Sequence, residues 1–340
     1  MKLLISLLGA QSEAVARAID LGKQLRGRGH ALDYLGTFTQ ADMAEIQAQG
    51  ASAIHQIGAE PYDALLVASL GGPDRLTQLA RRMPTVLLVQ ESMLDLMSLK
   101  GDFVHWVSLF RAARGIVFMT EQQRDKVFAS FITGLDTARI VTMGCGAPAE
   151  AFAPRAGKPK EFFGIAMSAP VVASKHQQDL ISAGERLREF NLIFTFIGNN
   201  SQMASLPEGI RKIVERHPER YVFTGAKTGS ETLQLLRDND LYCHTSSDEG
   251  WSQAVINSAA IGLPLMLSEI DAFAGTWING VNCLKFPIGK PDFLASSLRM
   301  LLQDDVLRAS LGTAAQGTAR RYSADRYTSV VTQLLESTKK

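Results

Sequence analysis

Short apolar runs alternate with longer amphipathic stretches along almost the whole of this sequence. That rhythm is typical of parallel strands joined by crossover helices, because strands buried on both faces have nearly continuous apolar sequences. In the first half, the predicted strands are Lys2–Leu8, Ala31–Leu35, Asp63–Ala68, Thr85–Val89, Gly115–Met119 and Arg139–Met143, and the predicted helices are Ser12–Arg28, Leu76–Arg82 and Glu121–Phe131. In the second half, the predicted strands are Phe162–Met167, Leu192–Ile197, Tyr221–Thr224, Leu241–Thr245, Leu263–Leu267 and Cys283–Phe286, and the predicted helices are His176–Phe190, Ser230–Asp238, Ser252–Ala260 and Asp292–Leu302.

The segment Gly146–Pro159 interrupts the alternation near the middle of the chain with three prolines and several small residues, which indicates a linker. A chain of 340 residues is also longer than one hydrophobic core usually serves. We therefore predict an α/β protein with two doubly wound, Rossmann-like domains, 1–150 and 151–320, that face each other across a cleft. Residues 321–340 are predicted to form a C-terminal helix that packs back on the first domain. Sheets of this kind bind ligands at the carboxyl ends of their strands.

Composition and charge exclude several functional classes. Hydrophobic residues make up 46% of the chain and charged residues 20%, which excludes a disordered protein. Thirty-five basic against thirty-four acidic residues give a net charge of +1, so no nucleic-acid partner is expected. The three cysteines have no Cys-x-x-Cys spacing and are interpreted as reduced core thiols of a cytoplasmic protein. No apolar run approaches the roughly 20 residues that span a bilayer, and the apolar N-terminal run is interpreted as a first strand rather than a signal peptide.

Two common nucleotide-binding motifs are absent from the sequence. The segment Leu8–Glu13, after the first predicted strand, has a single glycine instead of Gly-x-Gly-x-x-Gly. The chain also lacks a Gly-Lys-Ser/Thr phosphate loop. Nicotinamide chemistry and P-loop hydrolysis are therefore disfavoured.

The segment Ser246–Pro264 resembles the donor-site signature of family 4 glycosyltransferases, in which Ser-x-x-Glu-Gly-Phe-Gly precedes a helix ending in Gly-Leu-Pro. Lys175 and the helix-like sequence after it look like the family's phosphate-binding lysine and the helix that follows. Val141–Pro154 is similar to the family's linker, and the resemblance is looser over the first 120 residues. It implies the GT-B architecture, with a nucleotide-sugar donor held by the C-terminal domain, an acceptor facing the N-terminal domain, and no metal or other cofactor.

The residues of this segment suit the implied chemistry. Glu249 and Gly250 stand between a strand and a helix that begins near Ser252, so the free N–H groups of that helix suit a diphosphate. Lys175 would stabilise negative charge on the leaving group, and Glu249 would accept hydrogen bonds from sugar hydroxyls. Asn257, about two helical turns beyond Glu249, would hold the ribose. The predicted donor-binding residues are Gly250, Trp251, Ser252, Asn257, Gly198 and Gly225, and the predicted catalytic residues are Lys175, Glu249, Gln90 and Glu91.

Four positions depart from the family pattern. Pro170 stands where the family usually has an arginine that shares the phosphate, and Asn257 replaces a second glutamate. Gln90, followed by Glu91, stands where the family commonly has a histidine, and glutamine cannot take a proton. A Gly-Gly turn in the first loop is also absent. Gln90 or Glu91 would then face the acceptor.

Three hypotheses for the function follow from these patterns. The first is a retaining glycosyltransferase of polysaccharide biosynthesis that moves a hexose from a UDP- or GDP-sugar to a glycan, lipid-linked or small-molecule acceptor. The second is a catalytically silent GT-B protein that binds or stabilises another transferase, and the third is an epimerase or phosphorylase on the same fold.

Each candidate residue also has a structural alternative. Glu249 could cap the following helix, Lys175 could be a solvated lysine, Asn257 could be a structural polar residue, and Gln90 and Glu91 could lie in a simple turn. A further amphipathic stretch is interpreted either as a packing helix or as a weak peripheral contact with the inner membrane face; its residues are His105, Trp106, Leu109, Phe110, Arg111 and Arg114.

Overall fold

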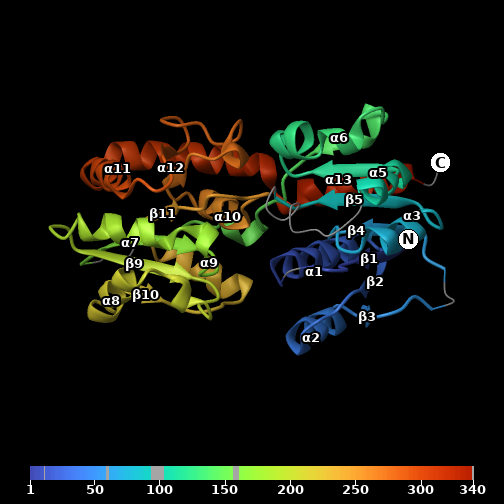
Figure 1. The fold of residues 1–340 in the computed structure, drawn as a ribbon, viewed down its shortest axis with the longest axis horizontal. Coiled ribbons are helices and arrows are strands. Elements are labelled where there is room, and N and C mark those ends of the chain that lie inside the picture. Colours follow the sequence, from blue (N-terminus) through green and yellow to red (C-terminus); the bar gives the residue numbers. More distant parts are fainter. Residues whose placement is uncertain (11, 59–60, 93–102, 156–160, 339–340) are drawn as a thin grey trace. The chain divides into compact units, whose positions relative to one another are not determined.

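The computed structural model describes residues 1–10, 12–58, 61–92, 103–155 and 161–338. The chain divides into two compact units (Figure 1). The first unit combines Met1–Cys145 with Ala324–Lys340, and the second is Gly146–Ser323.

Within the described residues, the first unit has a parallel sheet of seven strands in the order β3-β2-β1-β4-β5-β6-β7. Its strands are β1 (Lys2–Ser6), β2 (Ala31–Leu35), β3 (Ser52–Ile54), β4 (Ala64–Val67), β5 (Thr85–Val89), β6 (Gly115–Phe118) and β7 (Ile140–Thr142). Its helices are α1 (Ser12–Gly27), α2 (Gln40–Ala48), α3 (Pro73–Ala80), α5 (Phe103–Ala112), α6 (Ala129–Ile132) and α13 (Ala324–Ser337). Helix α13 comes from the far end of the chain and contacts α1, β5 and β6.

Helix α5 belongs to the core of the first unit. Its residues Trp106, Leu109 and Phe110 are buried against α3 and the central strands. The ring of Phe110 stacks at 5.8 Å on Phe128 and at 5.5 Å on Phe131. The packing interpretation of this helix is therefore confirmed, and the interpretation of these three side chains as a membrane-facing surface is wrong.

The segment Glu121–Phe131 does not form the single α-helix that was predicted. Residues Gln123–Val127 form a π-helical turn, in which Phe128 N donates to Gln123 O, and the short helix α6 follows. The side chain of Gln123 is buried and ties this turn to the end of β6, because its Oε1 accepts hydrogen bonds from the backbone N–H groups of Met119 and Thr120. The extra residue of a π turn shifts the register of the helix. Both Phe128 and Phe131 then contact Phe110.

The second unit has a six-stranded parallel sheet among its described residues, in the order β10-β9-β8-β11-β12-β13. Its strands are β8 (Phe163–Ser168), β9 (Leu192–Ile197), β10 (Tyr221–Phe223), β11 (Leu241–His244), β12 (Leu265–Ser268) and β13 (Leu284–Phe286). Its helices are α7 (Gln177–Glu185), α8 (Glu208–Arg216), α9 (Gly229–Arg237), α10 (Gln253–Ile261), α11 (Pro291–Gln303) and α12 (Asp305–Ala319). The strand order reverses between β8 and β11, and such a switch point is where open α/β sheets bind ligands.

The predicted strands correspond to observed strands, but four of the described helices and strands were not predicted. Helix α2 buries only Ile46 and presents no strong apolar stripe. Helix α8 has no fully buried residue, although Ile210, Ile213 and Val214 pack against the core. Strand β3 has three residues at the edge of its sheet. Helix α12 begins directly after α11 and is rich in alanine, threonine and glycine. The predicted helix from His176 begins one residue later, because His176 has a left-handed φ of 50°.

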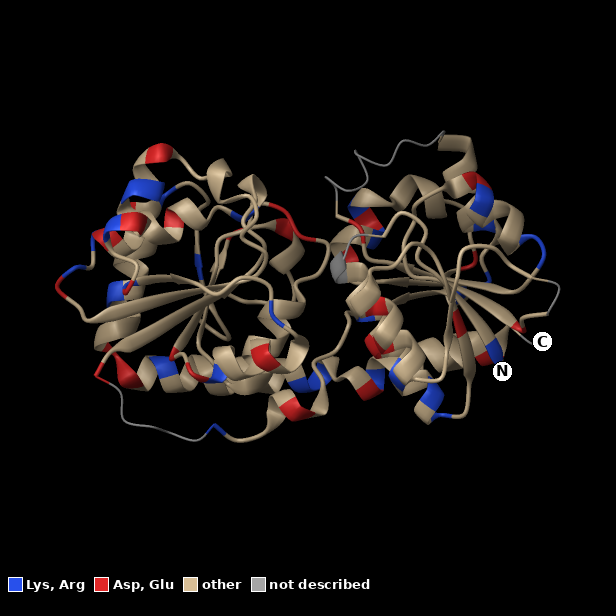
Figure 2. Ribbon diagram, turned by 90° about the horizontal axis from the view of Figure 1, so that it is seen from below, with Lys and Arg blue, Asp and Glu red and all other residues tan. Residues whose placement is uncertain are grey.

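Three further features bear on the expectations from composition. The cysteines Cys145, Cys243 and Cys283 are all free and buried, as predicted. Acidic and basic residues are interspersed along the helices of each unit (Figure 2). Among the described residues, no helix combines the length and the apolar character needed to cross a membrane.

The aromatic stack around Phe110 leads to a prediction about stability. Phe110→Ala should lower the free energy of unfolding by about 3–5 kcal/mol, because it leaves a large cavity among rings that cannot collapse. Phe293→Ala is the matched control, since Phe293 is 60% exposed and should change stability by less than about 1 kcal/mol. Urea denaturation of the three proteins measures both effects, and equal midpoints would contradict the assignment of Phe110 to the core.

Candidate functional site

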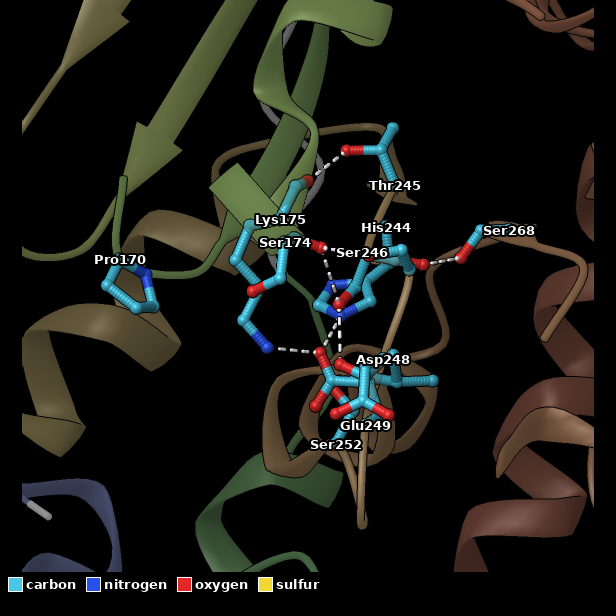
Figure 3. Close-up of polar contacts among 12 residues, drawn as sticks. Pro170, Ser174, Lys175, His244, Thr245, Ser246, Asp248, Glu249, Ser252 and Ser268 are labelled. Atoms are coloured by element: carbon cyan, nitrogen blue, oxygen red, sulfur yellow. Dashed lines mark hydrogen bonds and ion pairs between the residues drawn. The ribbon is translucent and has the colours of Figure 1, made fainter. Parts of the chain in front are cut away.

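Lys175 and Glu249 form an ion pair at the carboxyl edge of the second unit's sheet (Figure 3). Lys175 Nζ lies 2.6 Å from Glu249 Oε1, although the two residues are 74 positions apart in the sequence. Their side chains are 16% and 10% exposed, so the pair is largely shielded from water. Lys175 follows β8 and Glu249 follows β11, and the direct pairing of these strands brings the two loops together.

Hydroxyl groups of the loop after β11 hold the loop that carries Lys175. Thr245 Oγ1 donates to the carbonyl oxygen of Lys175 at 2.7 Å, and Ser247 N and Ser247 Oγ donate to that of Ser174 at 2.8 and 3.1 Å. Ser246 Oγ donates to Asp248 O and thereby braces its own loop. These bonds satisfy carbonyl groups of the 3₁₀ turn Ala173–Lys175 and fix the backbone from which Lys175 extends.

His244, which sequence analysis did not select, is the third member of the cluster. Its Nε2 lies 2.8 Å from Glu249 Oε1 and its Nδ1 lies 2.9 Å from the hydroxyl of Tyr242 (Figure 3). The side chain is 2% exposed. His244 is the one residue of strand β11 that can carry a positive charge, and this was the available signal in the sequence.

Glu249 is held in its charged form. Burial by itself raises the pKa of this carboxyl, but the Lys175 ammonium and the hydrogen bond from His244 outweigh it and lower the pKa from 4.5 to about 2. Glu249 is therefore a carboxylate at neutral pH and acts as a hydrogen-bond acceptor.

The start of helix α10 lies directly after Glu249. Ser252 is the N-cap, and its side chain accepts a hydrogen bond from Val255 N. The N–H groups of the first helical positions, Gln253 and Ala254, lack partners inside the helix, as at any helix start. Trp251, predicted to bind the donor, packs on the ring of Tyr322 at a centroid distance of 5.1 Å. Gly250 connects this packed residue to Glu249.

Asn257 lies one turn into the same helix. Its Oδ1 accepts a hydrogen bond from Gln253 Nε2 at 3.0 Å, and the same nitrogen donates to Gly146 O. The amide oxygen is thus already bonded within the second unit, which gives Asn257 a structural role in the absence of a ligand.

Pro170 lies in the loop between β8 and α7, and the two predicted glycines follow β9 and β10. The carbonyl oxygen of Pro170 accepts a hydrogen bond from Gln177 Nε2 at 2.7 Å. Gly198 has a φ of 147°, and a Cβ at this position would lie 2.3 Å from Ala169 O. Gly225 has a φ of 73°, and its carbonyl oxygen accepts from Gly198 N. Close backbone approach explains why glycine occupies position 198.

Gln90 and Glu91 belong to the first unit. Gln90 Oε1 accepts a hydrogen bond from Arg17 Nε at 2.6 Å. The Glu91 carboxylate accepts from Leu70 N at 2.8 Å and from Gln90 N at 3.0 Å. Both side chains therefore organise the loops at the carboxyl ends of β4 and β5. Among the described residues, no three histidine, cysteine or acidic side chains gather in a way that could hold a metal ion.

The second unit resembles known proteins in sequence. The family model described as "Glycosyl transferases group 1" matches residues 163–304, a range that includes Lys175, His244 and Glu249. Residues 163–304 are thus similar in sequence to the group 1 glycosyltransferases. The matched range runs from β8 to the end of α11, so it contains the whole described sheet of the second unit.

Solved structures show the fold of the entire chain. A glycosyltransferase from Rickettsia africae superposes with a TM-score of 0.82 at 12% identity and covers 100% of this chain and 98% of its own. HepE from Anabaena, in complex with UDP and glucose, superposes with a TM-score of 0.76 at 16% identity, covering 99% of this chain and 100% of its own. The two parallel sheets with flanking helices thus form the GT-B fold, as predicted.

A curated relative matches over part of its length. Phosphatidyl-myo-inositol mannosyltransferase of Mycobacterium leprae is 26% identical over 192 residues, which cover 56% of this chain. The aligned part spans 50% of that mannosyltransferase. The similarity therefore covers about half of each protein, and the reaction of the whole protein is a matter for proposal.

The contact at Gly198 leads to a prediction for this domain. Gly198→Ala should destabilise the protein by about 1–3 kcal/mol, because the new methyl group collides with a backbone carbonyl and the φ is unfavourable for alanine. Gly209→Ala, at an open position in helix α8, is the control and should be neutral or stabilising by up to about 1 kcal/mol. Thermal and urea unfolding compare the two variants, and equal stability would argue against the steric account of Gly198.

The pKa of Glu249 leads to a second prediction. A carboxyl with a lowered pKa contributes stability that is present above its ordinary pKa of 4.5 and lost as the pH falls toward about 2. The natural protein should therefore exceed Glu249→Gln in unfolding free energy by at most about 3 kcal/mol near pH 7. The difference should shrink between pH 5 and pH 3. Urea titrations of both proteins at several pH values measure it, and a constant difference would show that Glu249 is not held ionised.

Proposed function

We propose that the protein is a retaining glycosyltransferase that moves a hexose from a UDP- or GDP-sugar to a glycan, lipid-linked or small-molecule acceptor. The second unit would bind the donor. The observation that carries the proposal is the meeting of Lys175 and Glu249 at the switch point of a sheet whose sequence is similar to the group 1 glycosyltransferases. The complex of HepE with UDP and glucose supports a nucleotide-sugar donor, and the name of the mycobacterial relative supports a hexose and a lipid-linked acceptor.

Lys175 would bind the diphosphate of the donor together with the start of helix α10. As the bond between the sugar and the diphosphate breaks, its electron pair leaves with the diphosphate, and negative charge grows there. A preorganised cation and free helix N–H groups stabilise this charge. Because these groups already supply a positive field, the reaction is proposed to need no metal.

Glu249 would accept hydrogen bonds from hydroxyl groups of the sugar. Both of its observed bonds go to Oε1, and within the described part of the chain Oε2 accepts none. Asn257 is proposed to bind the ribose after releasing Gln253, and Gln90 or Glu91 to face the acceptor. Without the charge of a second glutamate, the ribose contact would be weaker than a carboxylate contact.

Removal of Lys175 tests the donor site. Lys175→Ala should abolish transfer and lower the affinity for the matching nucleotide by at least about tenfold, since a charge-assisted contact to phosphate is lost. UDP, GDP and their sugars at a hundredfold over the dissociation constant should stabilise the natural protein by about 2.7 kcal/mol in thermal unfolding. Each variant is compared with its own ligand-free melting temperature.

Lys212→Ala is the matched control for this test. Lys212 is also ion-paired, with Glu208 at 2.6 Å, but lies exposed on helix α8. It should keep the ligand-induced stabilisation of the natural protein. Unchanged turnover in Lys175→Ala would contradict the assignment of the donor site.

The second candidate function is a catalytically silent subunit that binds or stabilises another transferase. It is favoured by Pro170, which provides no cation for a phosphate, and by Gln90, whose side chain is bonded to Arg17. Transfer or hydrolysis of a nucleotide sugar by the purified protein would contradict this alternative.

A further inference from the structure

Two donors share one oxygen of Glu249. Lys175 Nζ and His244 Nε2 both approach Oε1, at 2.6 and 2.8 Å (Figure 3). In the described residues, Oε2 receives no hydrogen bond. The carboxylate is thus anchored through Oε1, and Oε2 is available to a ligand. With only one of the two donors, the carboxylate would turn more freely.

The protonation of His244 follows from its partners. A carboxylate only accepts hydrogen bonds, so Nε2 must carry the hydrogen that points at Glu249. Nδ1 lies 2.9 Å from the hydroxyl oxygen of Tyr242. The same hydroxyl oxygen lies 3.3 Å from Ser168 O, so the bond to Nδ1 is the shorter of the two. Whether Tyr242 donates to Nδ1 or accepts from it, Nε2 carries a hydrogen and donates it to Glu249. Glu249 therefore fixes Nε2 as a donor, while Tyr242 bonds to the other ring nitrogen.

The imidazole ring has little freedom to leave this position. It stacks on the ring of Tyr242 at 5.9 Å and meets the edge of Phe273 at 5.8 Å. Lys175, in contrast, extends from a 3₁₀ turn on a long flexible side chain. Of the two donors to Glu249, the histidine is fixed and the lysine is able to move.

The ligand that Lys175 is proposed to bind competes with Glu249 for the same ammonium group. The carboxylate of Glu249 already forms an ion pair with Lys175. A diphosphate that engages Lys175 must draw it away from Glu249 or share it. Glu249 then loses one of its two donors and keeps its place only if the other remains.

We propose that His244 is a positioning residue of the donor site, which holds Glu249 in place for the sugar when Lys175 exchanges its bond with Glu249 for one to the donor's diphosphate. This inference rests on the proposed function. In this arrangement Lys175 binds the diphosphate, Glu249 binds the sugar, and His244 keeps Glu249 in position while Lys175 binds the diphosphate.

Two substitutions at His244 separate positioning from folding. The amide of glutamine reaches about as far as Nε2, so His244→Gln keeps a donor toward Glu249. The amide of asparagine reaches only as far as Nδ1, so His244→Asn keeps a polar contact toward Tyr242 and loses the one to Glu249. A merely structural role would be affected by both changes alike.

The measurement is the ratio of two dissociation constants obtained by calorimetry, that of a nucleotide sugar over that of its nucleoside diphosphate. UDP-glucose with UDP and GDP-mannose with GDP serve as the probes. His244→Asn should raise this ratio about tenfold, as expected for the loss of a well-placed carboxylate contact. His244→Gln should stay within about threefold of the natural protein, and thermal unfolding checks that each variant is folded.

Glu249→Gln tests the exchange independently of any change at His244. Replacing the carboxylate by a neutral amide removes the ion pair that competes for Lys175, so UDP or GDP should bind at least about threefold more tightly than to the natural protein. A simple donor-binding role for Glu249 predicts no gain in affinity for a ligand that carries no sugar.

Each outcome decides a different point. Equal ratios in His244→Asn and His244→Gln would overturn the positioning role, and unchanged or weaker UDP and GDP binding by Glu249→Gln would overturn the exchange. If the natural protein binds none of the four nucleotides, the proposed function itself fails, and the inference fails with it.

Discussion

The parallel pairing of β8 with β11 is the constraint on which the candidate site depends. Parallel strands end at the same edge of a sheet, so the loops that follow β8 and β11 must meet although they are far apart in the sequence. The hydroxyl groups of Thr245 and Ser247 then bond to the carbonyl groups of the facing turn. A buried ion pair needs such a fixed frame, because the cost of desolvating two charges is recovered only with good geometry.

Local patterns in the sequence predicted the sheets well. Runs such as Thr85–Val89 and Leu192–Ile197 coincide with observed strands, because a strand buried on both faces needs continuous apolar sequence. Helix α2 was not predicted, since it buries only Ile46 and leaves no periodic signal. Helix α8 does have apolar residues at helical spacing, Ile210, Ile213 and Val214, so its signal was available in the sequence. The buried side chain of Gln123 in the π turn also donates to Glu91 O at 2.7 Å, a contact across 32 positions that leaves no local pattern.

The sequence predicted two residues of the site but not the contacts that these residues make with each other. Lys175 and Glu249 were selected through a resemblance, and each was assigned to a ligand. Their bond to each other could not be predicted, because it depends on which strands are neighbours in the sheet. His244 was missed for a related reason: its position in a strand suggests a core residue, and it becomes informative only once Glu249 lies 2.8 Å from its ring.

The return of the chain to the first unit has a consequence for the order of folding. The second unit, Gly146–Ser323, is an insertion between two segments of the first unit. The two ends of the insertion are close together, because Ala147 and Ser323 form a β-bridge. Helix α13, with Val331 and Leu335 buried, completes the first unit from beyond that insertion. During synthesis, residues 1–145 must wait for helix α13, which is made after the whole second unit, whereas the second unit is complete as soon as Ser323 has emerged from the ribosome.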